Sequence, residues 1–398
     1  MSYIDENQWK SCTLCGECLK KCPVLKMDEK EAQSEIEQLI NGAKNLRIFK
    51  ECTFCFNCNS YCTAEGLKPH EMILQRYMEH RSEVPAVLSY LINGMPLPTF
   101  FQDLYARLRV EEREILNKWS RIPTAAKEVL WIGCIGKISC YDIENSTVLR
   151  NLPKYGPADL CCGELAYRLG SWQAYEDTVE RMLTRLRQLE VDRLVCYCGS
   201  CYNFLSNKLP TVYGERLPFK VVSMYQWLWE NVEKGNLEVQ NPVNCKAAIH
   251  ESSYVSELEP EFADVLRKLY KTINMDTVEL EHRGENAYTC GAVGLLLRTK
   301  NPFKIVKEHR RVYGEVKKAG VKSIALNCPG CYINLAASNR FFGLKLHYMP
   351  DELLRAFGDT ISTPFAKRIS LINKVLATRL PGLLFKRGKP VLERIERE

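Results

Sequence analysis

Two stretches of the chain repeat one hydrophobic pattern. Apolar side chains at positions i, i+4, i+7, i+8 and i+11 of residues 175–186 predict a helix with one buried face, and residues 305–316 repeat these places, with His309 as the polar member. A short apolar run follows each helix, at residues 193–196 and 323–326, and a Cys-x-x-Cys follows each run. Matching positions are a constant 130 residues apart (175 to 305, 198 to 328). The pattern therefore predicts an internal duplication.

Each half of the duplication opens on a further apolar run, at residues 129–134 and 247–250. Strand, helix and strand in this order predict a small unit with a parallel sheet. Several cysteines come directly after predicted strands, and open α/β sheets bind their ligands at the carboxyl ends of the strands. We therefore expect one site in each half.

One cysteine spacing occurs twice near the start of the chain. The run Cys-x2-Cys-x2-Cys-x3-Cys occupies residues 12–22, followed by Pro23, and residues 52–62, followed by Thr63. The run resembles that of bacterial ferredoxins, in which three cysteines hold one 4Fe–4S cubane and the fourth crosses to the other cubane. Zinc ribbons use paired knuckles instead. The resemblance implies one cubane on Cys12, Cys15, Cys18 and Cys62, and a second on Cys52, Cys55, Cys58 and Cys22.

The 398-residue chain contains 19 cysteines. The N-terminus lacks the pattern of a signal peptide, and no apolar run reaches the ~18 residues of a membrane-spanning helix. A reducing compartment and bound metal are therefore expected rather than disulfides. The formal charge of +7 is mild, and no nucleic-acid-binding motif accompanies it. We expect a cytoplasmic location, or one at the inner face of the membrane as part of a complex.

The first half resembles the cysteine-rich CCG domain found in the B and D subunits of heterodisulfide reductase. The family pattern is a cysteine after a strand, then Cys-Cys-Gly, then Cys-x-x-Cys, and it implies a non-cubane 4Fe–4S cluster. The matching residues are Cys134, Cys161, Cys162, Cys198 and Cys201. The gap before Cys161 is shorter than usual in the family, which leaves Cys140 as a rival of Cys134 for the first ligand. Cys196 lies inside a predicted strand and is expected in the core.

The second half departs from this pattern. Ser253 stands at the first cysteine position, and Thr289 stands where Cys-Cys-Gly would begin. The thiols that remain as metal candidates are Cys290, Cys328 and Cys331. Three alternatives remain open: an empty or structural site, a smaller metal site and a full non-cubane cluster. The smaller site would be a cubane with one open iron, or a zinc completed by Cys245 or a histidine. His309 is expected to be a core histidine with hydrogen-bond partners, and His250 is a weaker candidate for orienting a ligand or substrate.

The order of parts resembles the D subunit of heterodisulfide reductase and predicts a mixed α+β and α/β protein. A basic amphipathic tail closes the chain, with seven basic and no acidic residues between positions 360 and 392. The tail is expected either to pack on its own chain or to dock on a partner or an anionic membrane surface. The expected units are a helical two-cluster ferredoxin domain (1–81, with a charged helix at 29–46), a connector (82–127, with a helix at 101–119), two CCG domains (128–241 and 242–350) and the tail (351–398).

The resemblance implies an iron–sulfur oxidoreductase subunit of anaerobic metabolism. Electrons would pass from the two cubanes to the non-cubane cluster, for disulfide or thiol chemistry of the heterodisulfide reductase type. The alternative is a non-catalytic electron-transfer subunit that links a flavin dehydrogenase or reductase to quinone or ferredoxin. Both interpretations imply partner subunits, namely a flavoprotein or a membrane cytochrome or quinone subunit.

Overall fold

Two parallel sheets of four strands organise the protein. The structure is a computed structural model, which describes residues 9–81, 84–93, 98–124, 126–258, 260–298, 303–384 and 386–388. The first sheet has the strand order β3-β2-β4-β5 and the second the order β7-β6-β8-β9, with every pair parallel. The strands are β2 Glu128–Trp131, β3 Lys154–Tyr155, β4 Arg193–Cys196, β5 Lys220–Ser223, β6 Cys245–His250, β7 Met275–Val278, β8 Ser323–Leu326 and β9 Lys345–Tyr348. The predicted parallel α/β halves are confirmed.

The strand register aligns the two halves residue by residue. Trp131 at the end of β2 lies opposite Cys196, and His250 at the end of β6 lies opposite Leu326. Cys196 and Leu326 are themselves 130 positions apart, like the Cys-x-x-Cys motifs that follow them. His250 therefore occupies in the second half the place that Trp131 occupies in the first.

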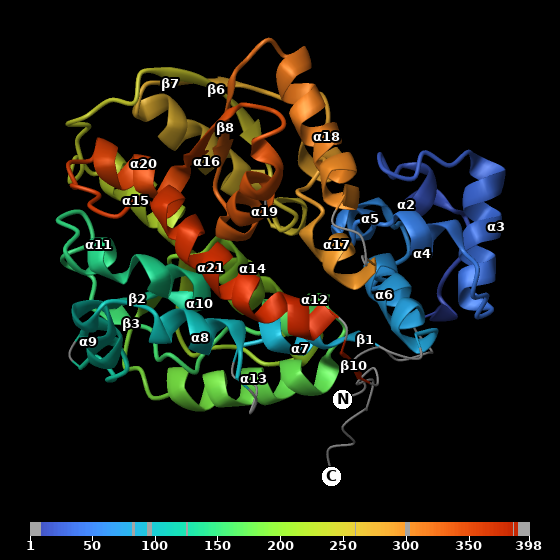
Figure 1. Ribbon diagram of the computed structural model, residues 1–398, viewed down its shortest axis with the longest axis horizontal. Coiled ribbons are helices and arrows are strands. Elements are labelled where there is room, and N and C mark those ends of the chain that lie inside the picture. Colours follow the sequence, from blue (N-terminus) through green and yellow to red (C-terminus); the bar gives the residue numbers. More distant parts are fainter. Residues whose placement is uncertain are drawn as a thin grey trace.

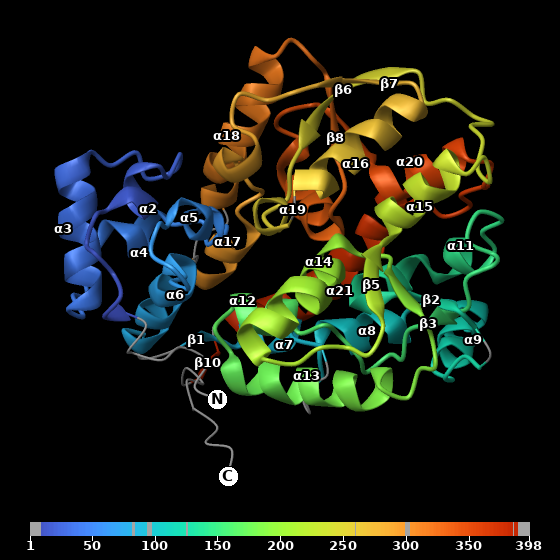
Figure 2. The same cartoon turned by 180° about the vertical axis from the view of Figure 1, so that it is seen from behind.

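Helices cover the sheets and join the two halves (Figures 1 and 2). The two helices of the repeated hydrophobic pattern are α13 Trp172–Leu186 and α18 Phe303–Lys318. The halves meet where α15 Met224–Glu233 packs on α16 Pro260–Thr272. The further elements of the halves are α10 Gly133–Gly136, η1 Lys137–Ser139, α11 Cys140–Glu144, α12 Glu164–Arg168, α14 Gly199–Asn203, the π-helix η2 Phe204–Tyr213, η3 Val255–Glu257, η4 Gly284–Asn286, α17 Ala292–Arg298, α19 Pro329–Asn339 and α20 Met349–Ala356.

The N-terminal helices form a lobe at one end of the molecule, beside α17 and α18 (Figure 1, blue). They are α2 Glu17–Lys20, α3 Glu29–Ile40, α4 Arg47–Glu51, α5 Asn57–Tyr61 and α6 Pro69–Glu79. The charged helix predicted over 29–46 is shorter than expected. It ends at Ile40 because Gly42 adopts a φ of 80°, a left-handed conformation that commonly terminates a helix.

The connector contains three helices, α7 Ala86–Leu91, α8 Phe100–Ala106 and α9 Val110–Trp119. The single helix predicted over 101–119 is therefore wrong. Arg109 interrupts it, because the backbone N–H of Arg109 donates to the Glu112 side chain at 3.0 Å and a new helix begins there.

The tail forms α21 Phe365–Leu384, and its apolar face packs on its own chain. Phe365, Ile372 and Val375 are buried, and α21 contacts α7 and α8. Arg379 on the same helix pairs with Asp103 at 2.8 Å. A short antiparallel pair joins β1 Val84–Pro85 to β10 Arg387–Gly388, and the predicted tail beyond position 388 lies outside the described residues. In the part of the chain that the structure describes, no helix has the length and apolar content needed to cross a bilayer.

Candidate metal centres

The two N-terminal cysteine loops share an unusual backbone conformation. Leu14 and Phe54 have φ values of 58° and 53°, and Gly16 and Phe56 both have 73°. Leu14 and Gly16 flank Cys15, the second cysteine of the first loop. Phe54 and Phe56 flank Cys55, the second cysteine of the second loop. Left-handed backbone is strained for bulky residues such as Leu and Phe, and such strain concentrates at functional sites. The repeated conformation indicates that both loops are shaped to enclose a ligand.

The first cysteine set lines a partly open cavity. Burial raises the pKa of Cys18 to about 12, and the neighbouring thiols, Cys62 first, add to the shift. The lining includes the four predicted ligands Cys12, Cys15, Cys18 and Cys62. Cys62 therefore lies with the first loop although it belongs to the second run, as the ferredoxin resemblance implies.

The second cysteine set shows the reciprocal crossing. Burial raises the pKa of Cys22 to about 11, and the thiol of Cys55 raises it further. Burial also raises the pKa of Cys58 well above its usual value, with Cys52 as the first neighbouring thiol and Cys22 among the others. Both sets thus offer four thiols in one place, and their donor chemistry fits a 4Fe–4S cubane in each.

The five predicted thiols of the first half form one continuous group. The Sγ atoms of Cys134 and Cys161 are 3.6 Å apart. Cys162 interacts with both Cys161 and Cys201, and Cys201 interacts in turn with Cys198. All except the half-buried Cys134 are buried. Hydrogen bonds from Cys134 and then Cys162 hold the pKa of Cys161 well below its ordinary value, so the group favours a thiolate.

Local backbone geometry brings this group together. Gly163 has a φ of 85°, and a Cβ there would lie 2.9 Å from the ring of Tyr175 on α13. A Cβ at Gly133 would lie 2.7 Å from Cys201 Sγ. Glycine is therefore required at both places, where the backbone passes close to the thiols.

The rival residues of the first half lie elsewhere. The Cys140 thiol donates to the carbonyl oxygen of Glu112 at 3.5 Å, and burial raises its pKa to about 12. Cys196 is fully buried, and burial accounts for its raised pKa. The structure thus brings Cys134, and not Cys140, to the other four thiols, and it places Cys196 in the core as predicted.

The three remaining thiols of the second half also lie together. Cys290 and Cys331 interact, as do Cys331 and Cys328, and all three are buried. Donation from Cys331 lowers the pKa of Cys290 to about 7. Counting three residues onward from the matched strand ends puts Ser253 at the place of Cys134, which confirms that this half lacks the first thiol.

His309, His250 and Cys245 differ in their contacts and therefore in whether they can assist the second-half thiols. His309 is buried and hydrogen-bonded to Ser338 Oγ at 2.6 Å and to the Cys290 carbonyl at 3.1 Å, so the predicted core histidine is confirmed. His250 is buried, and neither ring nitrogen has a hydrogen-bond partner within the described residues. Cys245 lies at the opposite end of β6, 3.7 Å from His347 Nε2. Cys245 is therefore excluded as a fourth ligand of the second-half thiols.

The N-terminal lobe docks on the second half through its second cysteine loop. Asn57 Nδ2 donates to the Ala287 carbonyl at 3.1 Å, and Tyr61 Oη donates to the Glu285 carbonyl at 2.5 Å. The thiols of the second cysteine set raise the pKa of Tyr61 after burial does. The second set therefore lies at the interface, whereas the first set opens on the cavity described above.

A buried charge group, which sequence reasoning missed, joins all three parts. Lys208 of η2 contacts Glu71 of the N-terminal lobe at 3.3 Å and also pairs with Glu257 of the second half. Tyr167 donates to Glu71, and Asn59 donates to it at 3.0 Å. No local pattern marks these residues, because their partners are distant in the sequence; Lys208 and Glu71 are 137 positions apart.

A series of aromatic rings runs from the second cysteine set to the first half. Phe56 lies between Cys55 and Cys58 in the sequence. Its ring centroid is 6.3 Å from that of Tyr167, and the ring centroids of Tyr167 and Tyr175 are 5.3 Å apart. Tyr175 packs under the Cys-Cys-Gly loop, and burial followed by the Cys162 thiol raises its pKa. The rings form a continuous contact path between the two thiol groups.

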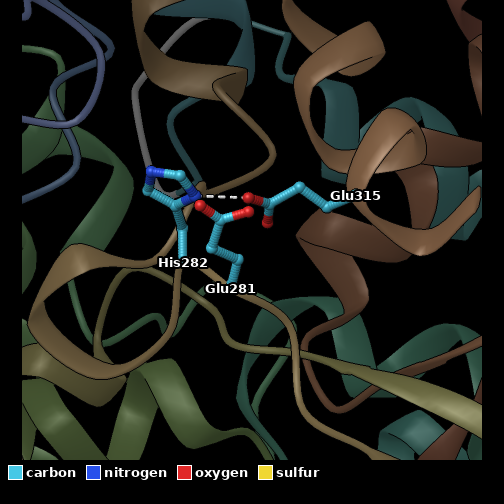
Figure 3. A group of neighbouring side chains, drawn as sticks. All are labelled: Glu281, His282 and Glu315. Carbon is cyan, nitrogen blue, oxygen red and sulfur yellow. Dashed lines mark hydrogen bonds and ion pairs between the residues drawn. The ribbon is translucent and has the colours of Figure 1, made fainter. Parts of the chain in front are cut away.

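The second half also contains a group of possible metal-ligand side chains without a cysteine (Figure 3). Glu281, His282 and Glu315 place ligand atoms within 4.8 Å of one another. His282 pairs with Glu315, and Glu281 pairs with Lys318 at 2.6 Å. These ion pairs explain why the three side chains lie close together on the second half.

Comparison with known proteins agrees with this geometry. Residues 4–63 match the 4Fe-4S dicluster domain, and residues 145–206 and 247–336 match the cysteine-rich domain. The chain thus combines a dicluster ferredoxin-type domain with a duplicated cysteine-rich domain.

The chain is homologous to the D subunit of heterodisulfide reductase. It is 22% identical to the D subunit of dihydromethanophenazine:CoB–CoM heterodisulfide reductase from Methanosarcina barkeri, over 82% of this chain and 88% of the relative. It is 24% identical to the B subunit of fumarate reductase (CoM/CoB) from Methanothermobacter marburgensis, over 86% and 70%. It is 24% identical to EtfAB:quinone oxidoreductase of Syntrophomonas wolfei over 57% of this chain, and it spans about a third (34%) of that relative. All three are oxidoreductases or subunits of them, as predicted.

Proposed function

We propose that this chain is an iron–sulfur subunit in which the N-terminal domain delivers electrons to the thiol group of the first half. The ring series from Phe56 through Tyr167 to Tyr175 is the observation that carries the proposal. The series begins between two proposed cubane ligands and ends beside Cys162. Bound clusters would supply one-electron redox chemistry at each thiol group: a cubane in each N-terminal set and a non-cubane 4Fe–4S cluster in the first half.

The proposed chemistry at the first half is the reduction of a disulfide or the oxidation of thiols. Support comes from the relation to the heterodisulfide reductase D subunit, which covers most of both chains. The chain itself contributes five converging thiols, burial, and an interaction network that favours a thiolate at Cys161. The incomplete thiol set of the second half favours one terminal site over two facing ones.

The second candidate is a relay without substrate chemistry. The loss of thiols at Ser253 and Thr289 favours it, and so does the relation to EtfAB:quinone oxidoreductase. In either case we propose partner subunits, a flavoprotein or a quinone-linked membrane subunit, and a cytoplasmic position that extends to the inner membrane face through those partners.

A thiol titration followed by electron paramagnetic resonance separates the two candidates. The anaerobically purified full chain is titrated with a small thiol and with its disulfide, and the Cys161→Ser variant is the control. Catalysis predicts a first-half signal that changes with thiol and is lost in the variant. A signal that ignores both reagents would eliminate disulfide chemistry and leave the relay.

A further inference from the structure

Lys137 is a fully buried cation with no carboxylate beside it. Its side chain is 0% exposed. The Nζ atom donates to the carbonyl oxygens of Pro157 and Leu160, the latter at 3.0 Å. Within the described residues, no carboxylate oxygen lies within 4.0 Å of Nζ. Lys208, which is also buried, has two carboxylate partners. An unpaired buried charge is costly, so a lysine kept in such a place needs another source of negative charge.

The groups that face Lys137 are the thiols of the first half. Burial lowers the pKa of Lys137, and Cys134 first, Cys161 next and then the exposed carboxylate Asp159 act in the opposite direction. Tyr105 connects the same parts: its ring lies 5.7 Å from Nζ, and its hydroxyl donates to the Cys134 carbonyl at 2.6 Å. The thiols are therefore first among the negative groups that accompany this cation, ahead of Asp159.

The hydrogen bonds of Lys137 also fix the loop that carries two of the thiols. Leu160 directly precedes Cys161 and Cys162. The stem of the lysine passes Gly156, where a Cβ would lie 3.5 Å from Lys137 Cε. The side chain thus anchors the loop from residue 157 to residue 160 and brings its charge to the thiol group.

The second half lacks this feature. The alignment that equates Ser253 with Cys134 equates Ser256 with Lys137. Ser256 serves a different contact, since its carbonyl accepts from Ser60 of the N-terminal lobe at 3.0 Å. At this aligned position, the half with the complete thiol set has a buried lysine and the other half has a serine.

We propose that Lys137 is the positioning residue and counter-charge of the first-half site, and that its charge makes reduction of a group bound there more favourable. The inference rests on the proposed function. A cation near a redox group stabilises the form that carries the extra electron, and net charge is one of the factors that set cluster potentials.

The test compares four forms of the full chain: wild type, Lys137→Arg, Lys137→Gln and, as a control, Lys154→Met. Lys154 is a half-buried lysine that donates to the Leu149 carbonyl at 2.8 Å, on the edge strand β3. The midpoint potential of the first-half resonance signal is measured, with the cubane signals as internal standards. Lys137→Gln should lower the first-half midpoint by at least 59 mV, a tenfold shift for one electron. The cubane midpoints, Lys137→Arg and Lys154→Met should stay near the wild-type values.

Each outcome decides the matter. An unchanged first-half midpoint in Lys137→Gln overturns the counter-charge role. Lys137→Gln could instead lose the first-half iron. Retention of iron in Lys137→Arg then supports the need for a cation at this position. Loss of iron in both variants overturns the counter-charge role and shows that the site requires the shape of the lysine side chain. A wild-type chain without any first-half signal would refute the proposed function itself, which is a distinct result.

Discussion

The replacement Lys208→Met tests whether the three parts of the chain are held together by one buried charge group. The side chains of Lys208, Glu71 and Glu257 are 1%, 6% and 5% exposed. Burial alone would raise the pKa of Glu71, but Lys208 first and then His70 outweigh burial and lower it. Glu71 is therefore an anion in the folded protein, and removal of the lysine leaves both buried carboxylates without this partner.

The expected cost follows from this burial. Breaking a buried ion pair by removal of one partner typically costs about 3–5 kcal/mol, because the remaining charge cannot return to water. At about 1.4 kcal/mol for each tenfold change, the unfolding equilibrium constant should rise by about two to four orders of magnitude. The replacement of Glu71 by Gln in the same chain should recover part of the loss, since one of the two stranded charges is then removed.

Urea unfolding of the anaerobic, iron-loaded chain measures this cost. Lys246→Met is the matched control, because Lys246 and Asp276 form an exposed pair, 60% and 69% exposed and 3.5 Å apart. The control should change the unfolding free energy by less than about 1 kcal/mol. If Lys208→Met costs no more than this control, the buried charge group does not hold the parts together and the reasoning is refuted.

Three further predictions concern single residues. Cys161→Ser should lower the iron content from about 12 to about 8 atoms per chain, four atoms for each cluster, whereas Cys140→Ser should leave it unchanged. An equal loss of iron in the two variants would make Cys140, rather than Cys134, the first ligand. The difference in unfolding free energy between wild type and His309→Gln should become smaller as the pH falls from 6.5 to 4. Burial lowers the pKa of His309 to about 4. The neutral ring therefore contributes fully to the stability of wild type above pH 6.5, the pKa in the unfolded chain. This contribution is lost as the pH falls from 6.5 to 4, by on the order of 3 kcal/mol. A gap that does not depend on pH, measured by chemical denaturation, would contradict the buried neutral ring. Gly163→Ala, with φ 85° and the Tyr175 ring 2.9 Å from the new Cβ, should destabilise more than Gly235→Ala, with φ 71° and nothing within 4 Å; thermal melts that rank them the other way would contradict the close approach.

The parts that sequence reasoning predicted are those marked by a repeated local signal. The 130-residue repeat predicted both parallel halves, and the resemblance of the cysteine runs to those of bacterial ferredoxins implied the crossing of Cys22 and Cys62 between loops. Spacing alone could not choose between Cys134 and Cys140, since both follow the same strand. The choice depends on Gly133, whose positive φ turns the chain toward Cys201.

The parts that were missed depend on contacts between distant segments. Lys208 meets Glu71 and Glu257 only after the three parts dock, so neither charge pattern nor periodicity reveals the group. The hydrophobic periodicity of residues 101–119 concealed a helix boundary, because the capping contact of Arg109 with Glu112 preserves the spacing of apolar residues across the break. No motif or periodicity in the sequence marks Lys137 as a buried residue.

Rapid-freeze electron paramagnetic resonance tests the central claim most directly. The full chain is mixed with a reduced ferredoxin, a donor too large to reach the buried first-half thiols, and the signals are followed in wild type and in Cys55→Ser. The account predicts that the cubane signals of wild type appear before the first-half signal, and that the first-half signal is strongly delayed in Cys55→Ser. Reduction of the first-half site at the wild-type rate in Cys55→Ser would contradict the proposed path from the N-terminal domain.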